Sequence, residues 1–311
     1  MARTPLVVAL MLAAAGLTAC TTAEPTAEPT AKPEASAAPS GSAAPAAVPT
    51  CDPRASLRPT TGLQIPAGSH MQKIKDRGRL ILGTNQGTVL FSSRDPFTAR
   101  IEGFDVDMGR EIAKAIFGDP DRLAIRVIPN AERMDRVEDG TVDLVISTMT
   151  TNCARLQRVD FSTVYYEAGQ RVLVGKDSPV QRIEDLGGRP VCSVAGSTSL
   201  DNLQKVDPKP ALVVRADYGA CLVAFQLGEA EAVSTDDTIL AGMAAQDPYA
   251  KVVGPRFTEE PYGIAIAKTH PEFTRYVNAV LERMRADGTW ARIHDRWLGG
   301  TAPQPPAARY R

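Results

Sequence analysis

Short apolar runs alternate with helical patterns along residues 51–299 of this 311-residue chain. Runs of strand length, rich in Val, Ile and Leu and bounded by polar, Gly or Pro positions, predict buried strands. They lie at residues 79–85, 123–129, 142–148, 171–176, 190–197, 211–216, 231–236 and 262–268. Between them, apolar positions spaced three and four apart predict amphipathic helices, at residues 104–118, 131–141, 221–232, 271–289 and 290–299. This alternation predicts an α/β fold with largely parallel sheets.

Two α/β units fit into a chain of this length. The second unit begins near Arg171, where a new series of strand patterns starts. The last strand pattern and the long helix after it, residues 262–289, can belong to either unit, because periodicity does not decide which sheet a strand joins.

The first twenty residues have a different pattern. Arg3 precedes an apolar stretch, residues 5–17, that is too short to span a bilayer as a stable helix. The stretch ends in Leu-Thr-Ala-Cys, which resembles the bacterial lipobox with Leu17 at its start and Cys20 at its end. That resemblance implies a signal peptide of residues 1–19 and a mature N-terminus at Cys20 that carries acyl chains such as palmitate. The alternative is an ordinary secretory signal in which Cys20 is incidental.

Residues 20–50 consist mainly of Ala, Pro, Thr and Ser. A segment of this composition buries too little apolar surface to offset the entropy of ordering it, so it is expected to be disordered, and its prolines keep it extended. We expect a tether that holds the folded body away from the extracytoplasmic face of the cell membrane. The Pro-rich residues 301–311 predict a flexible tail.

Composition argues against several classes of function. The 35 Lys and Arg residues balance 36 Asp and Glu, so a net charge of -1 gives no reason to expect nucleic acid binding. The three histidines are scattered and no Cys-x-x-Cys pair occurs, so we expect neither a metal site nor a cofactor. The sequence motifs of serine hydrolases and zinc peptidases are absent, and we expect no enzymatic activity.

Four cysteines remain after Cys20, an even number that predicts two disulfides in an exported protein. Three connectivities are open. Cys192 lies in a predicted strand and Cys221 at a helix nearby, which favours that pair. The pair Cys51–Cys153 then pins the start of the body beside the loop after residue 148.

Several motifs in order resemble the polar amino-acid binding proteins of ABC importers, the glutamine and glutamate type of bacterial extracellular solute-binding proteins, family 3. The first is GFDVDM at residues 103–108. The second is the segment 143–169, which resembles the family's strand, binding loop, arginine and hinge, and the third is the segment 184–199, which resembles the opening of its second lobe. The last three are EAVSTDD at 231–237, YGIAIAK at 262–268 and DGTWARIHDRW at 287–297. The resemblance covers residues 72–299. It implies an amino-acid ligand and a membrane partner made of an ABC transporter permease and its ATPase. We expect the protein to be a monomer.

The same resemblance implies a periplasmic-binding-protein type II fold with two α/β lobes and two crossover hinges. Lobe 1 is expected to comprise residues 51–168 and 260–300, and lobe 2 residues 171–258. The crossovers are expected at residues 163–171 and 257–263. The two lobes then close around the ligand like a hinge.

A free amino acid brings an α-carboxylate and an α-ammonium that must both be paired when they leave water. The resemblance assigns the α-carboxylate to Arg155, whose planar guanidinium can donate two parallel hydrogen bonds. Thr150, and Ser197 with Thr198 at a strand-to-helix turn, are expected to complete that site. The turn at 197–198 can also be a plain helix cap.

The resemblance assigns the α-ammonium to Asp236, at the end of a predicted strand. Asp237 is adjacent and is the alternative. Ser147 and Thr148 are expected to add acceptors for the same ammonium group.

The side-chain pocket is expected near Asn85 and Gln86, because ligands of open α/β sheets bind beyond strand ends. Arg94 and Arg100 follow in a loop and can select an acidic side chain if either points inward. In the glutamine-binding pattern an aspartate usually stands at Asn85. Asn85 is neutral and can face a carboxylate or an amide, so we expect glutamate or aspartate, or their amides.

Two other functions are open on the same fold. The protein can report amino-acid availability to a membrane signalling partner instead of delivering the ligand. It can also be an enzyme of the dehydratase or peptidoglycan-lyase type, which needs a carboxylate at the ligand. Glu259 and Glu260, at the second crossover, are the candidates for that role, but we expect both to be solvated hinge residues.

Overall fold

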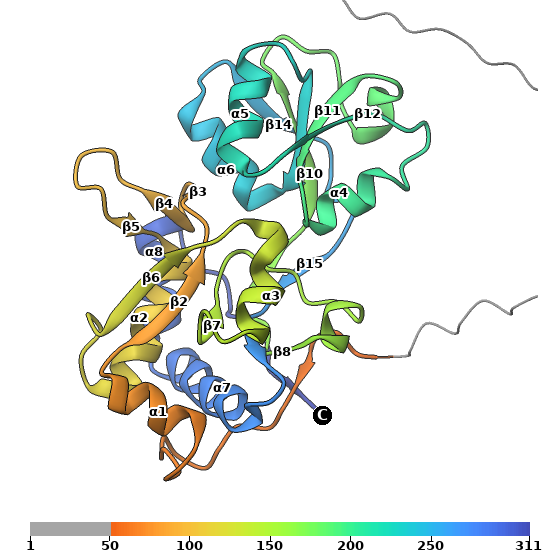
Figure 1. Cartoon of the computed structure of the whole chain (residues 1–311). Helices are drawn as coiled ribbons and strands as arrows, with labels where there is room; N and C mark the ends of the chain where they lie inside the picture. Colours follow the sequence, from red (N-terminus) through yellow and green to blue (C-terminus); the bar gives the residue numbers. More distant parts are fainter. Residues whose placement is uncertain (1–50) are drawn as a thin grey trace, which may run out of the picture. The chain divides into compact units, whose positions relative to one another are not determined.

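The computed structural model describes residues 51–311 (Figure 1). The predicted signal peptide, Cys20 and the tether lie outside the described residues. Within residues 51–311, no helix combines the length and the apolarity that crossing a membrane requires.

The first sheet has five strands in the order β6-β2-β7-β16-β8. Their bounds are β2 (Leu80–Thr84), β6 (Leu123–Val127), β7 (Leu144–Val145), β8 (Val159–Phe161) and β16 (Ala265–Ala267). Side chains alternate between its two faces, so Leu80 and Leu82 join one core while Ile81 packs against another. Both faces are therefore covered by apolar side chains, as the continuous strand patterns predict.

Helices surround this sheet, and we call the whole group lobe 1. They are α1 (His70–Arg77), α2 (Phe104–Phe117), α3 (Arg133–Glu138), α7 (Pro271–Ala286) and α8 (Thr289–Leu298). Helix α2 ends where the sequence predicts, because Gly118 adopts the left-handed conformation at its C-cap with φ of 76°. A small sheet of β3 (Gly87–Thr88), β4 (Ser92–Arg94) and β5 (Ile101–Glu102) and the short helices η1 (Asn130–Glu132) and η2 (Arg155–Gln157) complete the lobe.

The second sheet also has five strands, in the order β12-β11-β13-β10-β14, and lies in the upper part of Figure 1. Its strands are β10 (Gln170–Gly175), β11 (Pro190–Val194), β12 (Ala211–Arg215), β13 (Ala232–Asp236) and β14 (Ala250–Val253). The helices of this group are α4 (Thr198–Leu203), α5 (Tyr218–Gln226), α6 (Asp237–Gln246) and η3 (Ile183–Leu186). We call the group lobe 2.

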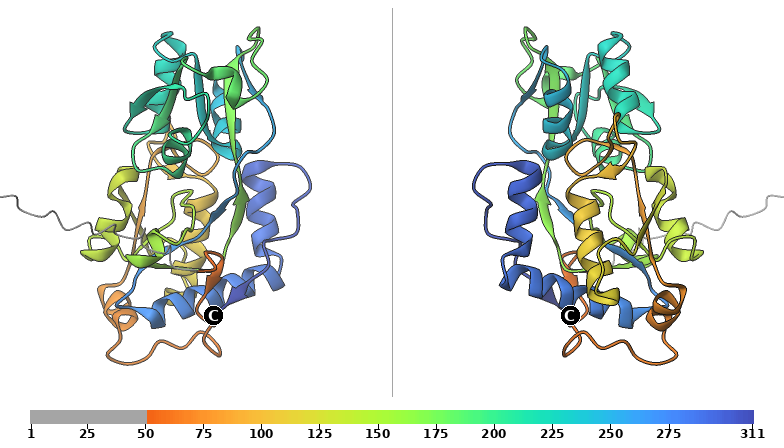
Figure 2. Two further views of the ribbon diagram at one scale, coloured as in Figure 1. Left: turned by 90° about the vertical axis from the view of Figure 1, so that its right-hand side faces the viewer. Right: turned by 90° about the vertical axis from the view of Figure 1, so that its left-hand side faces the viewer.

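Two crossover strands connect the lobes. Strands β9 (Tyr166–Ala168) and β15 (Glu260–Tyr262) pair antiparallel, which makes a two-stranded ribbon that can be followed in Figure 2. The strand that leaves each crossover, β10 or β16, runs antiparallel to both of its neighbours. The sheets are thus largely parallel, as expected, with one reversed strand in each at the point where the chain enters that lobe.

The last residues differ from the flexible tail that the sequence predicts. Strand β17 (Arg309–Tyr310) pairs in parallel with β1 (Ala55–Ser56), and the Arg311 guanidinium donates to Asp160 at 2.8 Å. The Pro-rich composition describes residues 303–306 but not the terminal Arg-Tyr-Arg, which supplies backbone groups and a charge with partners in lobe 1.

Both predicted disulfides are confirmed, Cys51–Cys153 and Cys192–Cys221. The second joins β11 to α5 inside lobe 2. The first ties the start of the described chain to the loop that leads to Arg155.

Candidate ligand-binding site

One backbone carbonyl of lobe 2 accepts hydrogen bonds from two arginines of lobe 1. Arg155 Nη2 donates to Gly196 O at 3.1 Å, and Arg133 Nη2 donates to the same oxygen at 3.2 Å. Gly196 has φ of 73°, and a Cβ at this position would lie 2.5 Å from Ala131 Cα. Only glycine allows this approach, so the turn between β11 and α4 is built for close contact with lobe 1.

Arg155 is buried, and the loop around it holds it in place. Its backbone N–H donates to Asn152 Oδ1 at 2.8 Å, and its Nη1 donates to Thr150 O at 2.7 Å. Burial lowers the pKa of Arg155 to about 10, and the neighbouring charge of Arg133 adds to this effect. Among residues 51–311, no carboxylate forms an ion pair with Arg155 or Arg133. Two buried guanidinium groups without carboxylate partners make a strong attraction for an anion.

Thr150 and Thr198 meet across the lobes at one carboxylate. Both hydroxyls donate to Glu260 Oε2 at 2.7 Å, and they lie 3.3 Å from each other. The other oxygen of Glu260 accepts from Asn202 Nδ2 at 3.0 Å and from Thr258 Oγ1 at 2.8 Å. The crossover residue Glu260 therefore joins lobe 1, lobe 2 and the hinge.

Ser197 is the N-cap of α4. Its hydroxyl accepts from Leu200 N at 3.1 Å and donates to Val194 O at 2.7 Å. The Ser197 side chain is thus committed to the turn, which is the plain capping role that the sequence left open.

Asp236 is buried at the end of β13 and accepts from Tyr262 OH at 2.6 Å and Ser199 Oγ at 3.3 Å. Burial raises the pKa of Asp236 to about 7, and the nearby Glu260 carboxylate acts in the same direction. Asp237 lies differently, because it pairs with Arg256 at 2.6 Å beside the crossover. Of the two adjacent aspartates, Asp236 is the one with a buried, costly charge.

Ser147, Thr148 and Asn85 lie together behind the arginines. Ser147 O accepts from Arg133 Nη1 at 2.8 Å, and its hydroxyl accepts from Asn85 Nδ2 at 3.0 Å. Thr148 has φ of 42°, and its backbone N–H donates to the buried carboxylate of Asp105 at 2.7 Å. The Thr148 hydroxyl and the Asn130 Nδ2 are buried without a hydrogen-bond partner in the described part of the chain. Of these two residues, Asn130 lines a cavity that both lobes border.

The Asn85 side chain holds its own loop. Its Oδ1 accepts from the backbone N–H groups of Gly87 and Thr88, both at 3.2 Å, and from the hydroxyls of Thr88 and Ser92. Asn85 nevertheless lines a cavity of about 360 Å³ that both lobes border, together with Gln86, Arg94, Asn130 and Asp217.

The two loop arginines differ in position. Arg94 is exposed and donates to Gln86 Oε1 at 2.9 Å at the edge of that cavity. Arg100 is exposed and lines a different cavity with Arg110 and Asp121. The structure therefore brings Arg94, but not Arg100, to the same cavity as Asn85 and Gln86.

Sequence reasoning missed Arg133. It stands on the buried face of α3, four residues before the buried Val137. A charged residue at an apolar position of a helical pattern was the available signal.

The expectation that Glu259 and Glu260 are both solvated is half correct. The Glu259 side chain is 85% exposed, whereas Glu260 is buried. The physical reason is the set of partners of each carboxylate. Glu260 accepts hydrogen bonds from Thr150, Thr198, Asn202 and Thr258, which offset the cost of burying it, whereas Glu259 pairs with Arg54 at the surface.

Comparison with known proteins finds relatives that are named as solute-binding proteins for amino acids. The model of the bacterial extracellular solute-binding proteins, family 3, matches residues 80–300. The glutamine-binding protein GlnH of Bacillus subtilis is 36% identical, over 72% of this chain and 83% of that protein. The glutamate-binding protein GluB of Corynebacterium efficiens is 34% identical, over 72% of this chain and 80% of that protein.

Solved structures of amino-acid binding proteins have the same fold as this chain. An ancestral arginine-binding protein bound to arginine matches with a TM-score of 0.67 and 32% identity, over 72% of this chain and 99% of that one. The P235GK mutant of an arginine-binding protein from T. maritima matches with a TM-score of 0.69 and 28% identity, over 74% of this chain and 99% of that one.

Proposed function

Because the chain belongs to the bacterial extracellular solute-binding proteins, family 3, we propose that it binds a free acidic amino acid between its two lobes and delivers it to an ABC transporter. The observation that carries the proposal is the set of opposite buried charges that the two lobes contribute. Lobe 1 supplies Arg155 and Arg133 without carboxylate partners in the described residues, and lobe 2 supplies Asp236.

Each charge has a role in holding a zwitterion. Arg155 takes the α-carboxylate, with Thr150 and Thr198 beside it. Asp236 takes the α-ammonium, and Ser147 and Thr148 contribute acceptors from lobe 1. Pairing both ligand charges offsets the cost of removing them from water.

Two features favour a second carboxylate on the ligand. Arg133 is a second buried guanidinium, and Arg94 borders the cavity of about 360 Å³. An arginine ligand would instead need a carboxylate partner for its side chain. Asp217 is the only carboxylate among the residues that line this cavity, and it already accepts from Ala220 N at 2.8 Å as the N-cap of α5. We therefore place glutamate and aspartate first and their amides second. Relatives are named for glutamine and for glutamate, so both kinds of ligand belong among the candidates.

The proposed delivery to a transporter also assigns roles to the lobes and to the N-terminal cysteine. Residues 51–168 with 260–300 and residues 171–258 act as the two closing lobes, and the protein is a monomer without a catalytic role. Cys20 carries the lipid anchor, so the body stays at the extracytoplasmic face, within reach of the permease and its ATPase.

Calorimetry of the mature chain against the twenty amino acids tests the ligand. Arg155→Ala leaves a ligand carboxylate buried and unpaired, which costs on the order of 2–5 kcal/mol. Affinity should therefore fall roughly thirtyfold or more for every ligand. The matched control is Arg158→Ala, because Arg158 lies three residues further on and pairs with Glu138 and Asp135 at the surface.

Folded Arg155→Ala that binds within threefold of the unchanged protein would overturn the assignment. Arg133→Ala separates acidic ligands from amides, because losing Arg133 should weaken glutamate or aspartate more than glutamine. Uptake of labelled ligand by cells that lack the gene, with and without its restoration, decides between delivery and sensing.

A further inference from the structure

Residues Cys51–Ser56, called the strap below, lie outside the family match, which begins at residue 80. Three attachments fix the strap to lobe 1. The disulfide Cys51–Cys153 joins it to the loop before Arg155. The buried Ser56 hydroxyl donates to Phe161 O at 2.6 Å and accepts from Asn278 Nδ2 at 2.8 Å. Strand β1 pairs with β17.

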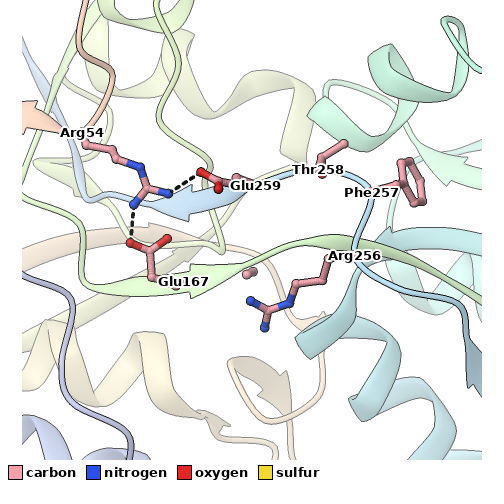
Figure 3. Close-up of a pocket in the computed structure, with 7 residues that line it drawn as sticks. Arg54, Glu167, Arg256, Phe257, Thr258 and Glu259 are labelled. Atoms are coloured by element: carbon pink, nitrogen blue, oxygen red, sulfur yellow. Dashed lines mark hydrogen bonds and ion pairs between the residues drawn. The ribbon is translucent and has the colours of Figure 1, made fainter.

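Arg54 reaches from the strap to both crossovers. Its guanidinium pairs with Glu167 of β9, and its Nη2 donates to Glu259 Oε2 at 3.0 Å beside β15. Figure 3 shows the guanidinium between these two carboxylates. Arg256 lines the same cavity, of about 520 Å³, but pairs with Asp237 and leaves both glutamates to Arg54.

The two faces of the crossover ribbon have different partners. Glu167 stands directly opposite Pro261 in the ribbon, so the two side chains share a face. Glu259 belongs to that face by alternation along the chain, whereas Glu260 points to the other face and joins Thr150 to Thr198. Arg54 therefore holds the ribbon from the face opposite to the one that joins the lobes.

We propose that Arg54 is a positioning residue for ligand binding, and that the strap braces both crossovers in the arrangement in which Glu260 joins the lobes. A guanidinium shared by one carboxylate from each crossover adds a side-chain connection to the backbone pairing of the two strands. Pro53 and Arg54 also border the cavity of about 490 Å³ that Thr150, Thr198 and Glu260 line, so the strap adjoins the contacts that it stabilises. This proposal rests on the proposed function, in which the lobes close on a ligand.

Loss of the Arg54 ion pairs should make ligand dissociation faster. Arg54→Ala should weaken binding of the best amino acid about two- to tenfold, because two partly exposed ion pairs are lost. The loss should come from faster dissociation in stopped-flow measurements, with an association rate within twofold of the unchanged protein. Arg54→Lys should recover part of the loss, since an ammonium keeps the charge but not the fork.

A matched control lies four residues further along. Arg58 stacks over the Tyr310 ring and makes no contact with a crossover carboxylate in the described chain. Arg58→Ala should leave affinity and dissociation unchanged. Equal effects of Arg54→Ala and Arg58→Ala, or no effect of either, overturn the proposal.

Hydrogen exchange of the ligand-free protein gives a readout that needs no ligand. Arg54→Ala should speed exchange of amides in 166–168 and 260–262, and Glu259→Gln, a change at an exposed side chain, should do so more weakly. Unchanged exchange in both variants overturns the brace. If the unchanged protein binds no amino acid, the proposed function fails, and the exchange measurement still decides the role of the strap.

Removal of the Cys51–Cys153 disulfide tests the role of the strap independently of the Arg54 side chain. Replacing Cys51 and Cys153 with serine frees the N-terminal end of the strap, while Ser56 and the β1–β17 pair still hold its other end. Arg54→Ala should therefore have a smaller effect on dissociation in that background than in the unchanged protein. Additive effects of the two changes would show that Arg54 acts without the strap, and this also overturns the proposal.

Discussion

At the scale of single residues, burial separates neighbours that look equivalent. Asp236 accepts from Tyr262 and Ser199 in a buried position, whereas the next residue, Asp237, pairs with Arg256 near the crossover. Burial and the nearby Glu260 raise the pKa of Asp236 to about 7. An ammonium ligand favours the carboxylate, so binding lowers this pKa and releases a proton when the pH is below about 7.

Ligand affinity should therefore depend on pH in a defined direction. It should be nearly constant above pH 7 and should fall as the pH drops, at most about tenfold per unit, because the carboxyl must lose its proton to pair with the ammonium. Calorimetry between pH 5 and 8, in buffers of different ionisation enthalpy, measures both the affinity and the proton released.

Two variants identify the group responsible. Asp236→Asn should bind weakly and show no slope, while Asp237→Asn should keep the slope of the unchanged protein. Burial also raises the pKa of Asp105 to about 7, so Asp105→Asn tests whether that carboxyl contributes. A slope that survives in Asp236→Asn contradicts the assignment of the ammonium to this residue.

At the scale of elements, the two ends of the described chain stabilise one another. Strand β17 pairs with β1, Arg311 N donates to Ser56 O at 2.9 Å, and the Arg311 guanidinium reaches Asp160. Ser56 in turn bonds to Phe161 O and Asn278 in the interior of lobe 1.

Deletion of residues 309–311 should therefore destabilise the body. We expect the free energy of unfolding to fall by about 1–3 kcal/mol, from a lost two-residue pairing and a half-exposed ion pair. Urea unfolding of the ligand-free protein measures the change. Gln304→Ala, at an exposed position in the same tail, is the control and should have no effect. Equal stability of the deletion and the full chain would mean that the β1–β17 pair contributes nothing.

At the scale of the whole molecule, the proposed delivery requires the body to stay near the membrane. The residues that supply this attachment, Cys20 and the tether up to residue 50, precede the described chain.

Cys20→Ser should remove the anchor. We expect this variant to leave the membrane fraction or to remain unprocessed, because acylation and cleavage both require the cysteine. Fractionation of cells, followed by mass measurement of the N-terminal peptide, checks both outcomes. Cys192→Ser, a change within lobe 2, is the control for loss of a cysteine as such. Normal processing and membrane retention of Cys20→Ser would contradict the lipid anchor.

The sequence by itself determined the fold class and most of the elements. Period-two and period-3.6 patterns describe local burial, so eight of the ten strands in the two five-stranded sheets and the end of α2 at Gly118 could be read directly. Strands β8 and β14 and helices α1 and α6 were not predicted. Ordered motifs pointed to the family, and Arg155 and Asp236 came with it. The preference for Cys192–Cys221, and with it Cys51–Cys153, came from the positions of the predicted elements.

The tertiary structure alone decided which polar side chains share a buried space. Arg133 and Glu260 were not chosen from the sequence. The helical pattern gave a weak signal for Arg133, but a charged residue at a helix start or a crossover is usually solvated, and only its partners show that it is buried. Asn85 turned out to hold its own loop, and Arg100 to line another cavity, for the same reason. Burial of a charge depends on contacts between residues more than a hundred positions apart, such as Thr150 with Glu260, and local patterns carry no information on those contacts.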